Sequence, residues 1–454
     1  MFKNFFPFFG FFGAKFFLWA GKKSFGFRQA VLAKILAFLP ATAIIGAVIN
    51  SGNVNYWAGA LKRVVVVGGG FGGVETALRL RRLSKSVEVI LVNDGDCFAF
   101  APAFYETAAG ELSEGDVCIL ISKLLGGKGI VYYHDAVKKI DLKRKFVQTK
   151  NVSEIRFDFL AMACGAQASC HGVLGVQKNA FSLKSKEDAE RIFEYTNNVL
   201  SQKRPHSFVV CGGGLTGVEF AATLKDHIEL SCMKFNCSVS GYPVSILQGG
   251  KTILPDLPKK AVDFAAKYLL SRGIKIVTGF HIVSVGQKSV TAADGRKIGF
   301  DMAVWAGGLR THDLIVQNGF PFSGAGSGRG LPGGGMLVNN FLQLKGHGFV
   351  FGAGDCICVD APKNPVVKTA QNAVDQAKVV AWNIDALLRG KKLRRYSQAR
   401  NKFYCALGKN MGMLVDGNRV LTGKKIRQKK ERLEEKYVEN LRKGLLSKRN
   451  IYGG

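Results

Sequence analysis

The stretch that decides the fold is Arg63-Val-Val-Val-Val-Gly-Gly-Gly-Phe-Gly-Gly73. Its run of valines predicts a buried strand, and the segment from Val74 to Leu83 has the pattern of a helix. A second apolar strand follows at Val87-Glu-Val-Ile-Leu-Val92. Strand, helix and strand in this order predict a βαβ unit, in which the two strands belong to one parallel sheet.

The glycines of this stretch have the spacing G-x-G-x-x-G between a strand and a helix, the setting in which this pattern binds a dinucleotide. Gly68 permits the tight turn, Gly70 lets the backbone approach a pyrophosphate, and Gly73 allows the helix to pack closely on the strand. The helix N-terminus attracts the anion. We therefore predict a dinucleotide site here that includes Phe71 of the loop.

The same pattern occurs a second time at Gly212-Gly-Gly-Leu-Thr-Gly217, after another apolar strand and before a helix that carries Glu219. The glycines with the three roles described above are Gly212, Gly214 and Gly217. Two dinucleotide sites in one chain imply electron transfer between two cofactors.

An acidic residue that binds a ribose hydroxyl is expected at the end of the second strand of each unit. Asn93 occupies this position in the first unit, followed by Asp94, and Gln248 occupies it in the second. A neutral side chain at Gln248 would not repel a 2′-phosphate. We therefore hypothesise that the second site accepts NADPH beside NADH.

A third motif is the short apolar strand Gly348-Phe-Val-Phe-Gly-Ala-Gly-Asp355, which ends in Gly354 and Asp355. After the two glycine motifs, it resembles the closing FAD motif of the two-dinucleotide flavoproteins, and the order of the three motifs is the order of that family.

Two further segments narrow the resemblance. Pro102-Ala-Phe-Tyr-Glu-Thr-Ala-Ala-Gly-Glu-Leu112 looks like a segment of the type II NADH dehydrogenases, and Ala370-Gln-Asn-Ala-Val-Asp-Gln376 is similar to their A-Q-x-A-x-x-Q quinone-site motif. The resemblance runs from about residue 62 to residue 423, and Asn93 and Gln248 are its clearest departures.

The resemblance implies that FAD takes a hydride from NAD(P)H and passes electrons to a membrane quinone. It also implies that the enzyme feeds electrons into a respiratory chain without pumping protons itself. It places Glu219 near nicotinamide and flavin, with a bond to the backbone of the nicotinamide domain as the alternative, and it places Gln371 and Gln376 beside the entering quinone. These two glutamines, five positions apart, do not share a helical face closely, so one can face the flavin and the other the substrate. The remaining residues assigned to the cofactors are Val137, Gly165, Gly307 and Ala370.

We predict an α/β fold of two Rossmann-like domains, with the NAD(P) domain inserted in the FAD domain, and a basic amphipathic C-terminal helix. The predicted parts are an apolar extension (1–61), the first FAD part (62–184), the NAD(P) domain (185–306), the second FAD part (307–390) and a membrane-associating region (391–454).

Segments near both ends of the sequence have features of membrane-associated segments. Residues 29–50 are nearly continuously apolar, and three interpretations stay open: a transmembrane segment, a cleaved targeting segment, or a mispredicted start. Residues 424–449 are basic and carry Ile426, Leu433, Tyr437, Leu441 and Leu445 on one helical face. A net charge of +31 favours an anionic surface, so we expect peripheral association with the cytoplasmic face. A homodimer is left open.

Two other functions remain open. A sulfide:quinone oxidoreductase needs a flavin-facing cysteine pair, for which the candidates are Cys164, Cys170, Cys356 and Cys358. A flavoprotein with a basic surface that binds nucleic acid would fit the net charge, but no recognised motif supports it, and we expect no nucleic-acid partner. The spacing of cysteines and histidines predicts no metal site.

Overall fold

The computed structural model describes residues 46–50, 53–57, 61–152, 154–323, 334–360, 366–398, 402–446 and 451. The chain divides into two compact units, Met1–Lys62 and Arg63–Gly454. In the first, β1 (Gly46–Asn50) and β2 (Asn53–Trp57) pair as an antiparallel hairpin. The predicted apolar membrane segment lies outside the described residues except for its last five. Among the described helices, none has the length and apolar character needed to cross a membrane.

The second unit contains a nine-stranded sheet that carries the first glycine loop. The strand order is β22-β23-β24-β25-β11-β3-β4-β7, with β26 paired to β23. β11 pairs in parallel with β3 and β25, and β4 pairs in parallel with β7. The valines of β3 are buried, as expected for a parallel strand covered on both faces. The bounds are β3 (Lys62–Val67), β4 (Val87–Asn93), β7 (Ile130–His134), β11 (Phe159–Met162), β22 (Phe322–Ser323), β23 (Gly335–Val338), β24 (Gln343–Leu344), β25 (His347–Gly352) and β26 (Ile357–Val359).

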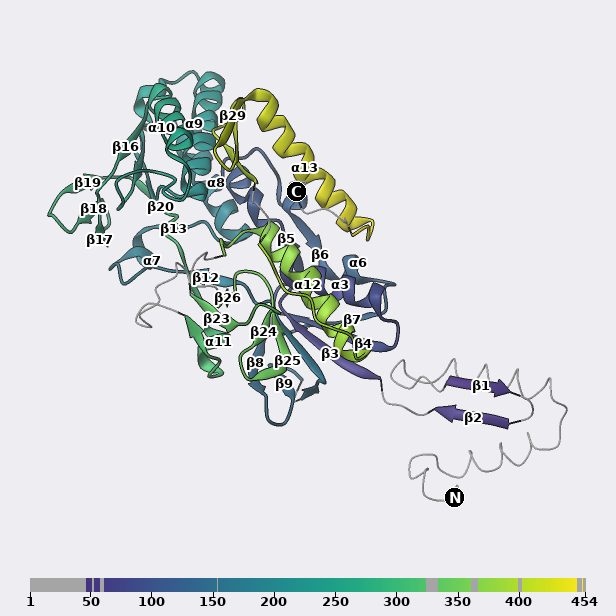
Figure 1. Ribbon diagram of the computed structural model, residues 1–454. Coiled ribbons are helices and arrows are strands. Elements are labelled where there is room, and N and C mark those ends of the chain that lie inside the picture. Colours follow the sequence, from purple (N-terminus) through teal and green to yellow (C-terminus); the bar gives the residue numbers. More distant parts are fainter. Residues whose placement is uncertain are drawn as a thin grey trace. The chain divides into compact units, whose positions relative to one another are not determined.

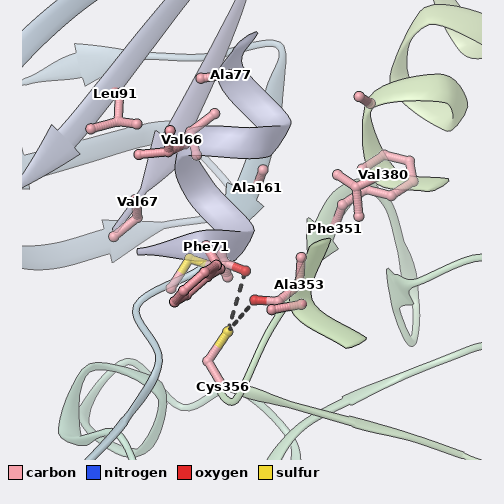
Figure 2. Packing of buried hydrophobic residues seen from close by; sticks show 14 of the residues in the cluster. Val66, Val67, Phe71, Ala77, Leu91, Ala161, Phe351, Ala353, Cys356 and Val380 are labelled. Carbon is pink, nitrogen blue, oxygen red and sulfur yellow. Dashed lines mark hydrogen bonds between the residues drawn. The ribbon is translucent and has the colours of Figure 1, made fainter. Parts of the chain in front are cut away.

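Two helices from opposite ends of the sequence, α3 (Phe71–Leu83) and α12 (Ala370–Leu388), pack against each other in this unit (Figure 1). Thr369 precedes α12, and its hydroxyl caps the helix by accepting a hydrogen bond from the Asn372 N–H at 3.2 Å. Phe71 of α3, Phe351 of β25 and Val380 of α12 belong to one buried core (Figure 2).

A second sheet of five parallel strands carries the second glycine loop, in the order β13-β20-β14-β15-β16. Its elements lie in the sequence between β11 and β22 of the first sheet, so the second Rossmann-like unit is inserted in the first, as predicted. The domain limits stay predictions, and β13 joins this sheet although it precedes residue 185. The bounds are β13 (Phe181–Ser182), β14 (Phe208–Cys211), β15 (Val244–Leu247), β16 (Ile274–Val277), β20 (Met302–Trp305), α8 (Lys186–Ser201), α9 (Leu215–Phe235) and α10 (Lys259–Ser271).

The C-terminal region is an antiparallel sheet of β27 (Lys402–Ala406), β28 (Gly412–Asp416) and β29 (Arg419–Gly423), followed by α13 (Lys424–Arg442). α13 packs on the body of its own unit. Its buried residues are Arg427, Lys430, Glu434, Tyr437, Val438 and Leu441. The predicted apolar face is therefore largely covered by protein, and Leu445 beyond the helix is its one exposed member.

Shorter elements complete the unit. Three pairs or triplets of strands form small antiparallel sheets: β5 (Cys97–Ala99) with β6 (Cys118–Leu120), β8 (Val137–Asp141) with β9 (Phe146–Thr149) and β10 (Ile155–Arg156), and β17 (Ile282–Val285) with β18 (Ser289–Ala292) and β19 (Lys297–Gly299). β12 (Ala166–Ala168) pairs with β21 (Leu309–Thr311). The short helices are η1 (Ala101–Ala103), α4 (Phe104–Ala108), α5 (Glu114–Val117), α6 (Ile121–Leu125), α7 (Val176–Asn179), η2 (Val239–Gly241) and α11 (Asp313–Gln317).

Candidate active site

The first glycine loop has the geometry that a dinucleotide requires. Gly68 has a φ of +115°, and a Cβ there would lie 2.2 Å from the carbonyl oxygen of Ala163. A Cβ on Gly73 would lie 1.8 Å from the carbonyl oxygen of Gly68, so both positions need glycine. A Cβ on Gly70 would meet nothing within 4 Å. Gly70 thus faces open space where a phosphate can approach the backbone.

The second loop repeats this arrangement. Cβ atoms on Gly212 and Gly217 would lie 2.5 Å and 1.9 Å from the nearest carbonyl oxygens, whereas Gly214 again faces open space. Both loops therefore fit a pyrophosphate at a helix N-terminus, α3 in one case and α9 in the other.

The two neutral residues at the strand ends hold the glycine loops. Asn93 Oδ1 accepts a hydrogen bond from the Gly69 N–H at 2.7 Å, and its Nδ2 donates to the Gly95 carbonyl at 2.8 Å. Gln248 Oε1 accepts from the Gly213 N–H at 2.9 Å. Each amide thus makes the loop contact that a carboxylate would make there, but brings no negative charge.

A cavity of about 410 Å³ lies where the motifs meet. The residues that line it come from the first loop, from α4, from the start of α9, from the Gly-Asp turn after β25 and from the start of α12. The predicted site residues among them are Gly70, Phe71, Gly165, Glu219, Gly354, Asp355 and Ala370. Segments more than 250 residues apart in the sequence therefore share one site.

Glu219 is the carboxylate from α9 that lines this cavity. Its Oε1 accepts a hydrogen bond from the Ala406 N–H of β27 at 2.9 Å and lies 3.9 Å from the Lys430 ammonium. Burial raises the pKa of Glu219 to about 7, against the opposing effect of Lys430. The backbone that Glu219 bonds belongs to the C-terminal region and not to the nicotinamide domain, the alternative considered from the sequence.

Lys430 of α13 joins Glu219 to a buried charge cluster. Its ammonium donates to the Tyr105 hydroxyl and to Glu434 Oε1, both at 2.9 Å, and its side chain is only 3% exposed. Although burial opposes the charge, Glu434 and Glu219 raise the pKa of Lys430 above its ordinary value. Tyr105 also lines the cavity, so α13 contributes to the site from behind.

The Gly-Asp turn is fixed from two sides. Gln376 Oε1 accepts a hydrogen bond from the Gly354 N–H at 2.7 Å, and Lys368 Nζ donates to the Asp355 carbonyl at 2.6 Å. Lys184 lies 4.0 Å from the Asp355 carboxylate. Burial lowers the pKa of Lys368, against the opposing effect of Asp355.

Other predicted residues lie outside the described lining of the cavity. Gln371 and Gln376 are both buried on α12, and Gln376 contacts the Gly-Asp turn. Gly307 lies between the lining residues Ala306 and Gly308, where a Cβ would meet the Trp305 ring. Asn93 ends β4, Asp94 follows it, and Val137 begins β8. Their roles stay predictions.

Sequence reasoning did not find four residues of the site: Tyr105, Lys184, Lys368 and Lys430. Tyr105 lies in the segment quoted for the resemblance, so that segment was the available signal. Lysines are usually solvated, and the sequence gives no sign that Lys368 and Lys430 are buried.

None of the described residues that line the cavity is a cysteine. Cys164 and Cys356 are in contact with each other. The hydrogen bond between their thiols, together with burial, raises the pKa of Cys164, and the same hydrogen bond lowers the pKa of Cys356 against the opposing effect of burial. The Cys356 thiol also donates to the Ala353 carbonyl at 3.3 Å (Figure 2). Among the described residues, no group of three His, Cys, Asp or Glu side chains is arranged as metal ligands.

The comparisons with known proteins agree with this geometry. Residues 62–377 match the model of the family described as pyridine nucleotide-disulphide oxidoreductase. A type II NADH:quinone oxidoreductase of Staphylococcus aureus is 27% identical over 379 residues, which cover 80% of this chain and 92% of that protein.

Two solved structures show the same fold. The sulfide:quinone oxidoreductase of Aquifex aeolicus has a TM-score of 0.74 at 21% identity, covering 85% of this chain and 93% of that one. NDH2 from Plasmodium falciparum in complex with NADH has a TM-score of 0.72 at 17% identity, covering 85% and 97%. The family matches the predicted cofactors, FAD and a nicotinamide dinucleotide, and its model covers more than half of the sequence. The chain belongs to the pyridine nucleotide-disulphide oxidoreductase family.

Proposed function

We propose that this protein is a membrane-associated type II NAD(P)H:quinone oxidoreductase, a respiratory-chain entry that pumps no protons. When bound, the flavin supplies the chemistry: it accepts a hydride from the nicotinamide and passes electrons to the quinone. The chain's own part is to align the two rings, exclude water and place polar groups around them.

One observation carries the proposal. A single cavity is bordered by Gly70 of the first glycine loop, Thr216 of the second and Asp355 of the Gly-Asp turn. The open backbone at Gly70 and Gly214 fits two pyrophosphates, and the cavity between them can take the reacting rings. This arrangement supports transfer between two bound dinucleotides and a third reactant.

Two observations support a quinone as the electron acceptor: the position of α12 at the cavity and the name of the Staphylococcus aureus relative. Ala370 and Ala373 from the first turn of α12 line the cavity beside the buried Gln371. We propose that the quinone ring enters here. Gln376 then acts as a positioning residue for the Gly-Asp turn, because its amide bonds the Gly354 N–H.

Reduction of a quinone to a quinol consumes two protons. Glu219, with a pKa near 7, can hold a proton on its carboxyl group at physiological pH, and the neighbouring Lys430 ammonium stabilises the carboxylate once the proton has left. We propose that this pair keeps an exchangeable proton next to the cavity.

The membrane association rests on charge. The exposed residues of α13 include Lys424, Lys425, Lys429, Arg432, Lys436 and Arg442. Deleting residues 424–454 would not test their role, since it would also remove Arg427 and Lys430, the buried cations that lie beside the carboxylates of Glu106 and Glu219. Point substitutions on the exposed face are the suitable variants.

Sulfide:quinone oxidoreductase stays the second candidate, because the Aquifex aeolicus enzyme has this fold and Cys164 contacts Cys356. Sulfide chemistry needs thiols at the flavin, yet the described lining of the cavity has none. Replacing both cysteines by alanine should leave NADH-dependent turnover in place and abolish any sulfide-dependent turnover.

The direct test is a steady-state assay of the purified protein with NADH, NADPH or sulfide as donor and a water-soluble quinone as acceptor. The proposal expects one quinone reduced for each nicotinamide oxidised, and no reduction with sulfide. Reduction with sulfide alone would establish the second candidate.

A further inference from the structure

A groove separate from the active site lies at the C-terminal end of α3. It has a volume of about 520 Å³ and shares no lining residue with the active-site cavity. Three segments form it. They are the end of α3 with the turn after it, the start of β7 (Ile130) with Lys128 just before it, and residues 444–446 after α13. The last segment closely approaches the second, since a Cβ on Gly444 would lie 2.7 Å from the Lys128 side chain.

Four cations line the groove: Arg81, Arg82, Lys85 and Lys128. Arg81 donates to the Ser84 carbonyl at 3.2 Å and Lys128 to the Leu124 carbonyl at 2.5 Å. Within the part of the chain that the structure describes, none of the four forms an ion pair with a carboxylate. Cations in the last turn of α3 interact favourably with the helix dipole. This interaction explains the presence of Arg81 and Arg82, but not that of Lys85 and Lys128.

Apolar side chains lie among these cations. Leu78, Ile130, Leu445 and Leu446 line the groove with them, and Leu445 is 58% exposed. Just outside it, Leu83 is also exposed, and its carbonyl accepts a hydrogen bond from Arg389 at the end of α12. A groove that combines uncompensated cations with exposed leucines is complementary to a ligand with an anionic head and an apolar chain.

We propose that this groove binds the headgroup of an anionic phospholipid, with the exposed leucines against the acyl chains, and so fixes this face of the enzyme to the membrane. The inference rests on the proposed function, in which the quinone comes from the membrane. It adds a membrane contact that the sequence did not indicate, because Arg81, Arg82, Lys85 and Lys128 belong to the predicted FAD domain and not to the basic C-terminal tail.

The test uses the full-length protein and vesicles of phosphatidylcholine with or without phosphatidylglycerol. The groove variant is Arg82→Glu with Lys85→Glu, since both side chains are exposed and their loss threatens no packing. The control is Lys260→Glu with Lys267→Glu, two exposed residues of α10 with the same change in net charge. Turnover of NADH with a water-soluble quinone is measured for each preparation.

We expect binding of the wild type to the anionic vesicles only. The groove variant should lose about tenfold or more in affinity, because each basic residue near an anionic surface adds about 1 kcal/mol, and the control should stay within about twofold. Leu445→Gln should weaken binding without a change in charge. Equal losses in groove variant and control, or equal binding of the wild type to neutral vesicles, would overturn the inference.

Two further outcomes separate the causes of failure. If vesicle binding is unaffected by the groove substitutions while turnover with NADH is normal, only the groove proposal fails. If turnover with NADH is absent in the wild type, the proposed function fails whatever the vesicles show. Tight binding of duplex DNA that is lost in the groove variant would assign the groove to another anion and refute the lipid.

Discussion

Glu219 is the residue whose chemistry depends most on its surroundings. Its carboxyl has a pKa of about 7 in the folded protein and 4.5 as the ordinary value, because burial disfavours the charge. The folded state therefore holds its proton more tightly than the unfolded state. Its contribution to stability is fully present below pH 4.5 and is lost as the pH rises through 7.

We predict that Glu219→Gln flattens this dependence. The free energy of unfolding of the wild type should fall between pH 4.5 and 7 by up to about 3 kcal/mol more than that of the variant. Urea denaturation at several pH values measures it, with the exposed Glu194→Gln as the control. A variant whose pH profile matches the wild type would show that Glu219 titrates normally.

Gln376 is predicted to act through the flavin and not on the quinone. Gln376→Leu removes the acceptor of the Gly354 N–H and should cost about 1–3 kcal/mol, with loss of bound FAD. Gln376→Glu keeps an acceptor and should retain the flavin. The ratio of flavin to protein absorbance measures the retained FAD. A raised KM for quinone at unchanged flavin content would instead indicate that Gln376 contacts the quinone directly.

Gln248 is predicted to decide whether the second site accepts a 2′-phosphate. Gln248→Glu keeps the acceptor for the Gly213 N–H but adds a negative charge. We expect kcat/KM for NADPH to fall about tenfold or more, with little change for NADH. If wild-type protein prefers NADH more than about a hundredfold already, the neutral side chain is not what sets the preference.

Among the elements, α13 departs most from expectation. The sequence pattern placed its apolar face on the membrane, whereas the structure places Tyr437 and Leu441 in the core of the protein. Tyr437 stacks on Phe71 of the first loop and donates to Glu75 of α3 at 3.1 Å. The helix is thus part of the wall behind the FAD site.

Arg427 tests this role of α13. Its side chain is 2% exposed and lies 2.5 Å from the Glu106 carboxylate, so Arg427→Ala leaves a buried charge without a partner and should cost about 3–5 kcal/mol. Arg432→Ala on the exposed side of the same helix should change stability by less than about 0.5 kcal/mol. Equal melting temperatures for the two variants would mean that α13 does not pack as described.

The sequence predicted well those elements whose signal is local. The two glycine loops and the strands before them were found because their pattern lies within about thirty residues. The partners of Lys430 and Arg427 could not be found, because Tyr105 and Glu106 lie more than 300 residues away along the chain. A Lys- and Glu-rich helix has the same composition whether its charges meet water or one another.

At the scale of the whole molecule, the insertion of one Rossmann-like unit in the other creates the active site. It brings the start of α9, the Gly-Asp turn and the start of α12 to one cavity. The order of the motifs predicted this topology, and the family comparison agrees with it. The order could not predict which face of α12 is turned to the cavity, and so the roles of Gln371 and Gln376 remained predictions.

In the proposed function, one bound flavin is reduced by a nicotinamide and oxidised by a quinone. The most direct measurement is the absorbance spectrum of the purified protein in the absence of oxygen, first with NADH and then with a water-soluble quinone. We predict a flavin spectrum that NADH bleaches and the quinone restores. A protein without flavin, or a flavin that sulfide bleaches and NADH does not, would contradict this account.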